Sequence, residues 1–238
     1  MQTTIKLFFS CLFCLALTLL SGCGDGVPSL TAVEQAEVDK IVTEHGTAAI
    51  VCYLEKLHDE SRNPDMDRVF KYLKHFVSKG ADVNATNGRY GDNSLRLLMT
   101  LNIDEKDEKN QEKLGLTLRF LLDKGADVNT DLGNGMTLLH IVTRDGGVED
   151  VRFFISRGAN VNAKEGGGWT PLHYAAYGGD VAVAKFLVSK KADVNAIGRG
   201  DFSGLMFMGP IQEITPLTLA KTNGNTEMIK YLESVGAK

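Results

Sequence analysis

Residues 169–196 read WTPLHYAAYGGDVAVAKFLVSKKADVNA, and this stretch decides the fold because it describes two short helices and a turn. Thr170 suits a helix N-cap, and Pro171 suits the first helical position, where its missing N–H costs nothing. Gly179 then interrupts the chain, and residues 181–188 have the apolar spacing of a second helix. The alanines of the first helix are small, so neighbouring units can approach it closely. We therefore expect a helical hairpin here.

The end of this stretch recurs along the chain, as a repeat protein requires. Related five-residue segments stand at 80–84, 125–129, 158–162 and 191–195, and a truncated copy stands at 236–237. The marker at the start of the first helix recurs in phase, at 137–140, 170–173 and 215–218. Two independent markers that share one period predict a stack of helical hairpins, each packed only on its neighbours.

A unit of 33 residues with these two markers resembles the ankyrin repeat, and the resemblance covers most of residues 47–238. It implies an all-α solenoid of about five helix-turn-helix units joined by β-turn fingers, in one domain over residues 30–238. Inserts are expected at 102–115 and at 198–213. The resemblance also implies that His140 and His173, one unit apart, hydrogen-bond the neighbouring turn.

The N-terminus has the pattern of a targeting signal. Residues 7–20 are almost continuously apolar, which suits a signal peptide and is too short for a comfortable membrane span. The tetrapeptide Leu20-Ser21-Gly22-Cys23 resembles the lipobox of bacterial lipoproteins, which implies removal of residues 1–22 and attachment of acyl chains such as palmitate at Cys23. The alternative is a secreted protein cut near Ser21.

The resemblance to lipoproteins implies a periplasmic location, with residues 23–29 as a lipidated tether. Gly24 follows Cys23 where an aspartate would favour the inner membrane, so the outer membrane is expected and the inner membrane stays open. Cys52 would then be the one thiol that remains after cleavage and lipidation, which excludes an intramolecular disulfide. We expect its side chain to be buried. Thr31 and Glu34 predict a capping box and a helix over residues 32–45 that Gly46 ends.

Composition and residue spacing exclude several classes of function. The chain is 43% apolar and 24% charged, as in ordinary globular proteins. Its formal net charge of −4 disfavours a nucleic-acid binder, whose affinity depends on an excess of Lys and Arg. No spacing assembles a catalytic triad, a phosphate loop or a metal site, so we expect no enzyme activity, no metal and no cofactor.

Ankyrin arrays generally bind other proteins through their turn tips and the concave face of the first helices, and we expect a monomer that does so. We expect the repeat position just before the helix marker to be exposed. In three units it holds Met136, Trp169 and Ile214. Slots at the end of the first helix include Arg144 and Tyr177. Trp, Tyr and Arg commonly anchor interfaces, so Met136, Arg144, Trp169 and Tyr177 are candidate partner-binding residues.

The long turn at 202–211 is apolar, although water-exposed turns seldom are. Its candidate partner-binding residues are Phe202, Leu205, Met206, Phe207 and Met208. Two interpretations stay open: the turn packs on the concave face of its own array, or a protein partner covers it.

By resemblance, bacterial ankyrin lipoproteins include proteins that neutralise toxins delivered to the periplasm. We therefore expect a membrane-anchored protein-binding module, with an immunity protein that occludes a toxin as the specific hypothesis. A general scaffold for periplasmic proteins is the main alternative. An unrecognised enzyme is the less favoured one.

Overall fold

The computed structural model describes residues 29–60, 63–87, 91–104, 106–199 and 213–238. The predictions for Cys23 and for the apolar turn at 202–211 lie outside these residues. The chain divides into two compact units, one ending at Thr130 and one running from Asp131 to Lys238. Each unit is described by itself.

The first unit begins with helix α3, Ala32–His45, whose start follows the predicted capping box. The Thr31 hydroxyl accepts the Glu34 N–H at 3.3 Å, and the Glu34 carboxylate accepts the Thr31 N–H at 2.8 Å. The helix ends at Gly46, whose φ of 56° is in the left-handed region. The sequence prediction for this helix is confirmed at both ends.

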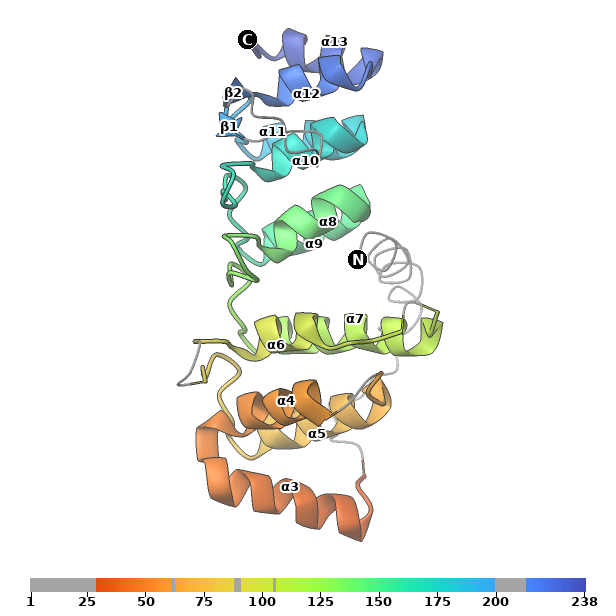
Figure 1. Cartoon of the computed structure of the whole chain (residues 1–238), viewed down its shortest axis with the longest axis vertical. Coiled ribbons are helices and arrows are strands. Elements are labelled where there is room, and N and C mark those ends of the chain that lie inside the picture. The colour runs from red at the N-terminus through yellow and green to blue at the C-terminus, as the bar shows by residue number, and fades with distance from the viewer. Residues whose placement is uncertain (1–28, 61–62, 88–90, 105, 200–212) are drawn as a thin grey trace. The chain divides into compact units, whose positions relative to one another are not determined.

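Two helical hairpins follow α3 in the first unit (Figure 1). A short 3-10 turn, η1 (Gly46–Ala48), leads into α4 (Ala49–Glu60) and α5 (Met66–Ser78), and the next pair is α6 (Ser94–Thr100) and α7 (Glu108–Asp123). Buried rings join α4 to α5: Tyr53 lies 5.3 Å from Tyr72 and 5.4 Å from Phe76, centroid to centroid. Aromatic pairs at these separations add stability beyond the area that they bury.

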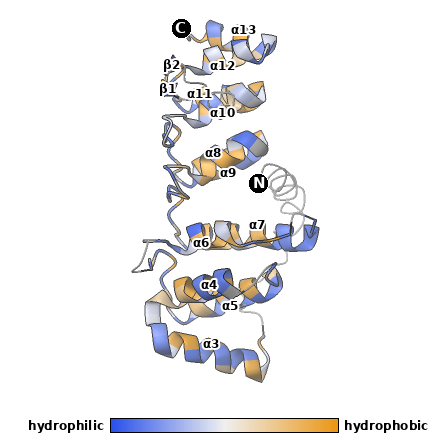
Figure 2. Ribbon diagram, in the orientation of Figure 1, coloured by the Kyte–Doolittle hydropathy of each residue, from blue (hydrophilic) through white to orange (hydrophobic). Residues whose placement is uncertain are grey.

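The predicted insert at 102–115 comprises the connection after α6 and the first turns of α7, which are hydrophilic in Figure 2. Asn63 fixes it from the α4–α5 loop: its N–H donates to the Asn102 carbonyl at 2.6 Å, and its side chain contacts Asp107 at 3.2 Å. Asp67 on α5 pairs with Lys109 and Lys113 of α7 at 2.6 and 2.8 Å, and these contacts lower the pKa of Asp67 to about 2. The insert is therefore tied to the preceding hairpin.

Within residues 131–199 and 213–238, the helices of the second unit form three hairpins (Figure 1). Their helices are α8 (Leu138–Asp145) with α9 (Val148–Ser156), α10 (Pro171–Gly178) with α11 (Val181–Ser189), and α12 (Pro216–Thr222) with α13 (Thr226–Ser234). The first helices contact one another in the order α8, α10, α12, and the second helices contact in the order α9, α11, α13. The predicted stack of all-α hairpins is confirmed, with the apolar faces of both rows buried between neighbours.

The residue that follows each second helix has a left-handed backbone. It is a glycine in the other repeats, and Lys191 is the predicted exception in residue type. Gly125, Gly158 and Gly236 have φ values of 91°, 88° and 88°, while Lys191 occupies the same position with a φ of 69°. Left-handed backbone costs a side chain with a Cβ about 1–2 kcal/mol. The prediction of a left-handed lysine here is confirmed.

Replacing Lys191 with glycine is therefore expected to raise the free energy of unfolding by about 0.5–1 kcal/mol, because relief of strain exceeds the added freedom of the unfolded chain. Urea unfolding followed by the fluorescence of Trp169, the single tryptophan, measures this in the second unit. The control is Lys190→Gly, at a φ of −96°, which should destabilise the unit. A loss of stability in the Lys191 variant would contradict the strain argument.

Candidate protein-binding surface

Backbone hydrogen bonds join the turns of the second unit to one another. The Gly166 N–H donates to the Asn134 carbonyl at 2.6 Å, and the Arg199 N–H donates to the Gly167 carbonyl at 2.6 Å. This approach requires glycine, because a Cβ added to Gly167 would lie 2.8 Å from the Arg199 carbonyl oxygen. The turns therefore form one continuous edge beside the first helices.

The predicted insert at 198–213 is closed at its base by a short antiparallel ladder. Strand β1 (Gly198–Arg199) pairs with β2 (Glu213–Ile214), so that Gly198 faces Ile214. Ile214 is only 6% exposed, so the expectation that it occupies an exposed slot is wrong. Pairing with β1 places Ile214 in the core, a long-range contact that a comparison of repeat positions does not reveal.

His140 and His173 hold the turns to the first helices, as predicted for their slot. The Thr170 N–H donates to His173 Nδ1 at 3.0 Å, which leaves Nε2 to donate to the Ile214 carbonyl at 3.0 Å. Nε2 of His140 likewise lies 3.0 Å from the Ala163 carbonyl oxygen and 3.1 Å from that of Trp169. Burial lowers the pKa of both imidazoles. The neutral tautomer satisfies each site, so these histidines are structural.

Trp169 lies half-buried at the junction of its turn with α10. Its indole stacks on His173 with centroids 5.9 Å apart and meets Tyr174 edge to face at 5.5 Å. Gly198 packs against it, since a Cβ there would lie 2.6 Å from the indole Cδ1. The indole is therefore held in one orientation, with part of its surface open to solvent.

Tyr174 is the centre of this cluster, and the sequence analysis did not select it. Its ring also meets His140 at 5.7 Å. Burial raises the pKa of the Tyr174 hydroxyl, the negative charge of Glu165 raises it further, and the positive charge of Arg144 opposes the shift. Tyr174 thus brings two predicted residues, Trp169 and Arg144, into one neighbourhood. The sequence does carry a signal for Tyr174: it stands three residues before Tyr177, so both side chains lie on one face of the helix.

Two large apolar side chains extend this surface into solvent. Tyr177, one helical turn after Tyr174, is 49% exposed, and Ile197, next to Gly198, is 45% exposed. The predicted residue Met136 occupies the slot equivalent to Trp169 one repeat earlier and is half-buried. We call Trp169, Tyr174, Tyr177 and Ile197 the aromatic surface. It offers rigid apolar contact area with phenolic hydroxyls, which suits binding of a protein surface.

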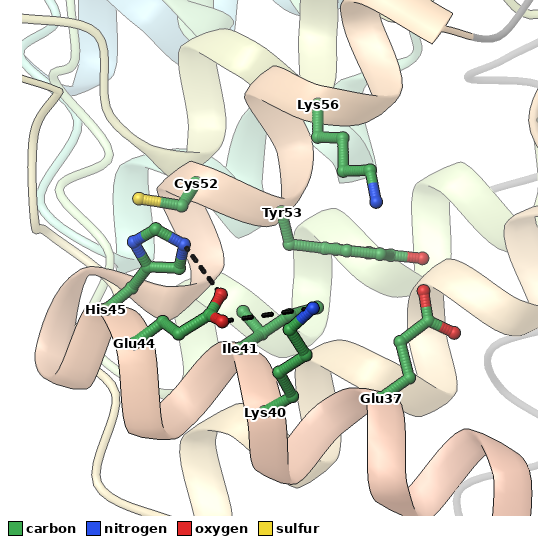
Figure 3. Close-up of a pocket in the computed structure, with 8 residues that line it drawn as sticks. All are labelled: Glu37, Lys40, Ile41, Glu44, His45, Cys52, Tyr53 and Lys56. Atoms are coloured by element: carbon green, nitrogen blue, oxygen red, sulfur yellow. Dashed lines mark ion pairs between the residues drawn. The ribbon is translucent and has the colours of Figure 1, made fainter.

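The first unit has a separate small cleft of about 160 Å³ between α3 and α4 (Figure 3). Charged side chains form much of its wall, and Glu44 lies 3.9 Å from Lys40 and 4.0 Å from His45. The remaining lining residues are Glu37, Ile41, Cys52, Tyr53 and Lys56.

Cys52 in this cleft is half-buried and free, so the expectation of full burial is wrong in degree. The reason is its place on the wall of the cleft, between α3 and the exposed side of α4. Burial and the nearby Glu55 charge raise the pKa of the thiol. A raised pKa disfavours the thiolate, so this cysteine lacks the property that a nucleophile needs.

Comparison with known proteins agrees with the repeat geometry. Residues 109–197 match the family model for ankyrin repeats, in three copies. Residues 109–197 therefore contain ankyrin repeats. No curated protein matches it. Ankyrin repeats are typically non-catalytic modules for protein–protein interaction, so the general function indicated for the chain is binding of another protein.

No group of three or more His, Cys, Asp or Glu side chains among the described residues is placed to hold a metal ion. Of the helices that the structure describes, none has the length and apolar character to cross a bilayer.

Proposed function

We propose that the chain is a lipid-anchored periplasmic protein that binds a protein partner through the turn edge and first-helix side of its second unit. The observation that carries the proposal is the aromatic surface, where Trp169 is fixed by His173 and Tyr174 while Tyr177 stands 49% exposed. Fixed aromatic side chains lose little entropy on binding, which is why they recur as interface anchors. Phe202, Leu205, Met206, Phe207 and Met208, which lie outside the described residues, are further partner-binding residues in the proposal.

The specific role that we propose is that of an immunity protein, which covers the active site or substrate entrance of a periplasmic toxin. The lipobox-like segment ending at Cys23 supports the location, because a lipid anchor would hold the protein where a membrane-attacking toxin acts. The ankyrin repeats support binding as the mode of action. Occlusion requires a rigid surface and no catalysis.

The direct test combines the chain from residue 24 with any toxin that proves to be encoded beside its gene, and it measures toxin activity and affinity. Inhibition at equal molar ratio is expected. Binding to several native envelope proteins without inhibition would instead establish a general scaffold. Metabolic labelling with a palmitate analogue tests the anchor separately, and Cys23→Ser should abolish the label.

Replacing Trp169 or Tyr177 with alanine is expected to weaken partner binding by ten- to a hundredfold, the usual loss at an interface anchor (about 1.4–2.8 kcal/mol). Calorimetric titration of partner captured from native envelope extract measures the loss. The matched control is Tyr231→Ala, a half-buried aromatic residue on α13 in the other helix row. Equal losses for Tyr177 and Tyr231, with helical circular dichroism unchanged, would count against the aromatic surface.

Deletion of residues 200–211 distinguishes the two interpretations of the apolar turn. Loss of partner binding with the array still folded supports a partner-facing turn. Loss of the array itself supports a turn that packs on its own chain. The ladder between β1 and β2 flanks the deleted segment.

A further inference from the structure

The second helices of the second unit carry rings and cations in alternation. The Arg157 guanidinium lies 4.8 Å from the Phe153 ring centroid, and the Lys190 ammonium lies 5.6 Å from that of Phe186. Each cation follows its ring by four residues at the same place in the repeat, so the helix brings both to one face. The arrangement therefore repeats with the period of the fold.

Contacts between neighbouring repeats make the arrangement continuous. Arg152 of α9 lies 4.6 Å over the Phe186 ring of α11, and Lys185 of α11 lies 5.8 Å over the Tyr231 ring of α13. We call the rings Phe153, Phe186 and Tyr231, with the cations over or beside them, the basic–aromatic row. The three rings are half-buried and the cations are exposed.

Positive charge is concentrated on this row. Residues 131–238 hold eleven acidic and eleven basic side chains, so the unit as a whole is balanced. Helix α11, at the centre of the row, has no acidic residue between Val181 and Ser189. On α9, Arg152 pairs with Glu149 at 3.3 Å. Helix α9 also holds Asp150, and α13 holds Glu227 and Glu233, so the excess of cations lies at the centre of the row, on α11 and the lysines that follow it.

Lys191 strengthens this excess at a cost to the fold. It lies next to Lys190, it is exposed, and its φ of 69° is one that the other repeats reserve for glycine. A side chain kept in a strained position points to a use for that side chain. Here the strained residue adds a cation beside the row.

We propose that the basic–aromatic row binds the anionic headgroups of a phospholipid bilayer. A periodic line of cations fits the repeated phosphates of a lipid surface better than it fits one protein surface of defined shape. Aromatic rings among Lys and Arg are also typical of the membrane interface. The proposal rests on the proposed membrane anchoring, which would supply the bilayer. The row then lies on the membrane, and the aromatic surface on the first-helix side of the same unit binds the partner.

The test uses the chain from residue 24, which keeps every described element and lacks the apolar segment and Cys23. Its binding to vesicles of phosphatidylcholine with phosphatidylglycerol is compared with binding to phosphatidylcholine alone. Each cation near an anionic surface contributes about fivefold in affinity, so Arg157→Gln/Lys190→Gln/Lys191→Gln should lose about a hundredfold. The matched control Lys164→Gln/Arg199→Gln/Lys238→Gln removes the same charge elsewhere in the unit and should lose little.

Lys191→Gly separates binding from folding. It should weaken vesicle binding about fivefold while the urea midpoint stays equal or rises, which a purely structural role for the lysine would not produce. Equal binding to both vesicle types, equal losses in the two triple variants, or binding of an acidic protein without vesicle binding would overturn the proposal. Because the tested chain lacks Cys23, a failure of lipidation in cells leaves this result unaffected.

Discussion

Replacing His173 with leucine is expected to lower the free energy of unfolding of the second unit by about 2–4 kcal/mol, because two buried backbone groups each lose a hydrogen bond worth about 1–3 kcal/mol when left unpaired. The Thr170 N–H would lose its acceptor, and the Ile214 carbonyl would lose its donor. Leucine keeps the apolar volume, so the loss reports the hydrogen bonds. Urea unfolding followed by Trp169 fluorescence measures it.

The location of the damage is part of the same prediction. His173 ties α10 to β2, so amide hydrogen exchange should rise first at Ile214 and at the α10 start. The control is His58→Leu in the first unit, whose side chain is 50% exposed, and the fluorescence transition should stay unchanged. A loss below 1 kcal/mol would mean that water or a shifted backbone satisfies both groups.

The fold was predictable because the two repeat markers are local. Thr170 and Pro171 fix the start of a helix, and a glycine position such as Gly158 fixes the end of the one before it, through backbone geometry that depends on nearest neighbours. The period between markers then specifies which helices stack. The same local reasoning predicts a left-handed backbone at Lys191.

The candidate site was predictable only in part, because its members meet through long-range contacts. Trp169 and Tyr177 could be selected by residue type and slot. For Tyr174 the sequence offers only its place on the same helix face as Tyr177, and the rings on two repeats that meet it are seen only in the fold. Ile214 was misassigned because its burial depends on strand pairing across a long insert. In the first unit, Asn63 contacts residues about forty positions away, and no periodic pattern marks such contacts.

Acidification from pH 7.5 to 5.5 is expected to lower the stability of the second unit, by at most about 1.4 kcal/mol for each of its two buried histidines. In the unfolded chain both imidazoles take up a proton as the pH falls through their ordinary value of 6.5. In the folded chain burial lowers the pKa of His140 and of His173, so at a given pH they take up less proton than in the unfolded chain. Unfolding then takes up protons, and it becomes easier as the pH falls.

The hydrogen bonds act in both directions: the backbone carbonyls that accept from Nε2 raise the two pKa values, whereas the threonine N–H groups at Nδ1 oppose protonation. Protonation would place a hydrogen on His173 Nδ1, where the Thr170 N–H already donates. On His140, the added hydrogen at Nδ1 would likewise face the Thr137 N–H. Neighbouring charges act on the same groups: Glu165 raises both pKa values, and Lys164 lowers that of His173.

The two histidines should carry most of the pH dependence between 5.5 and 7.5. Stability is expected in full above pH 6.5 and to fall below it, and His173→Leu should remove about half of the slope while lowering stability at every pH. Trp169 fluorescence in urea, at steps across this range, gives the slope directly. If the dependence of stability on pH were unchanged in the His173→Leu variant, His173 would take up its proton in the folded chain as it does in the unfolded chain. In that case its contact with Ile214 would survive the charge, and the neutral-tautomer account of the turn edge would be wrong.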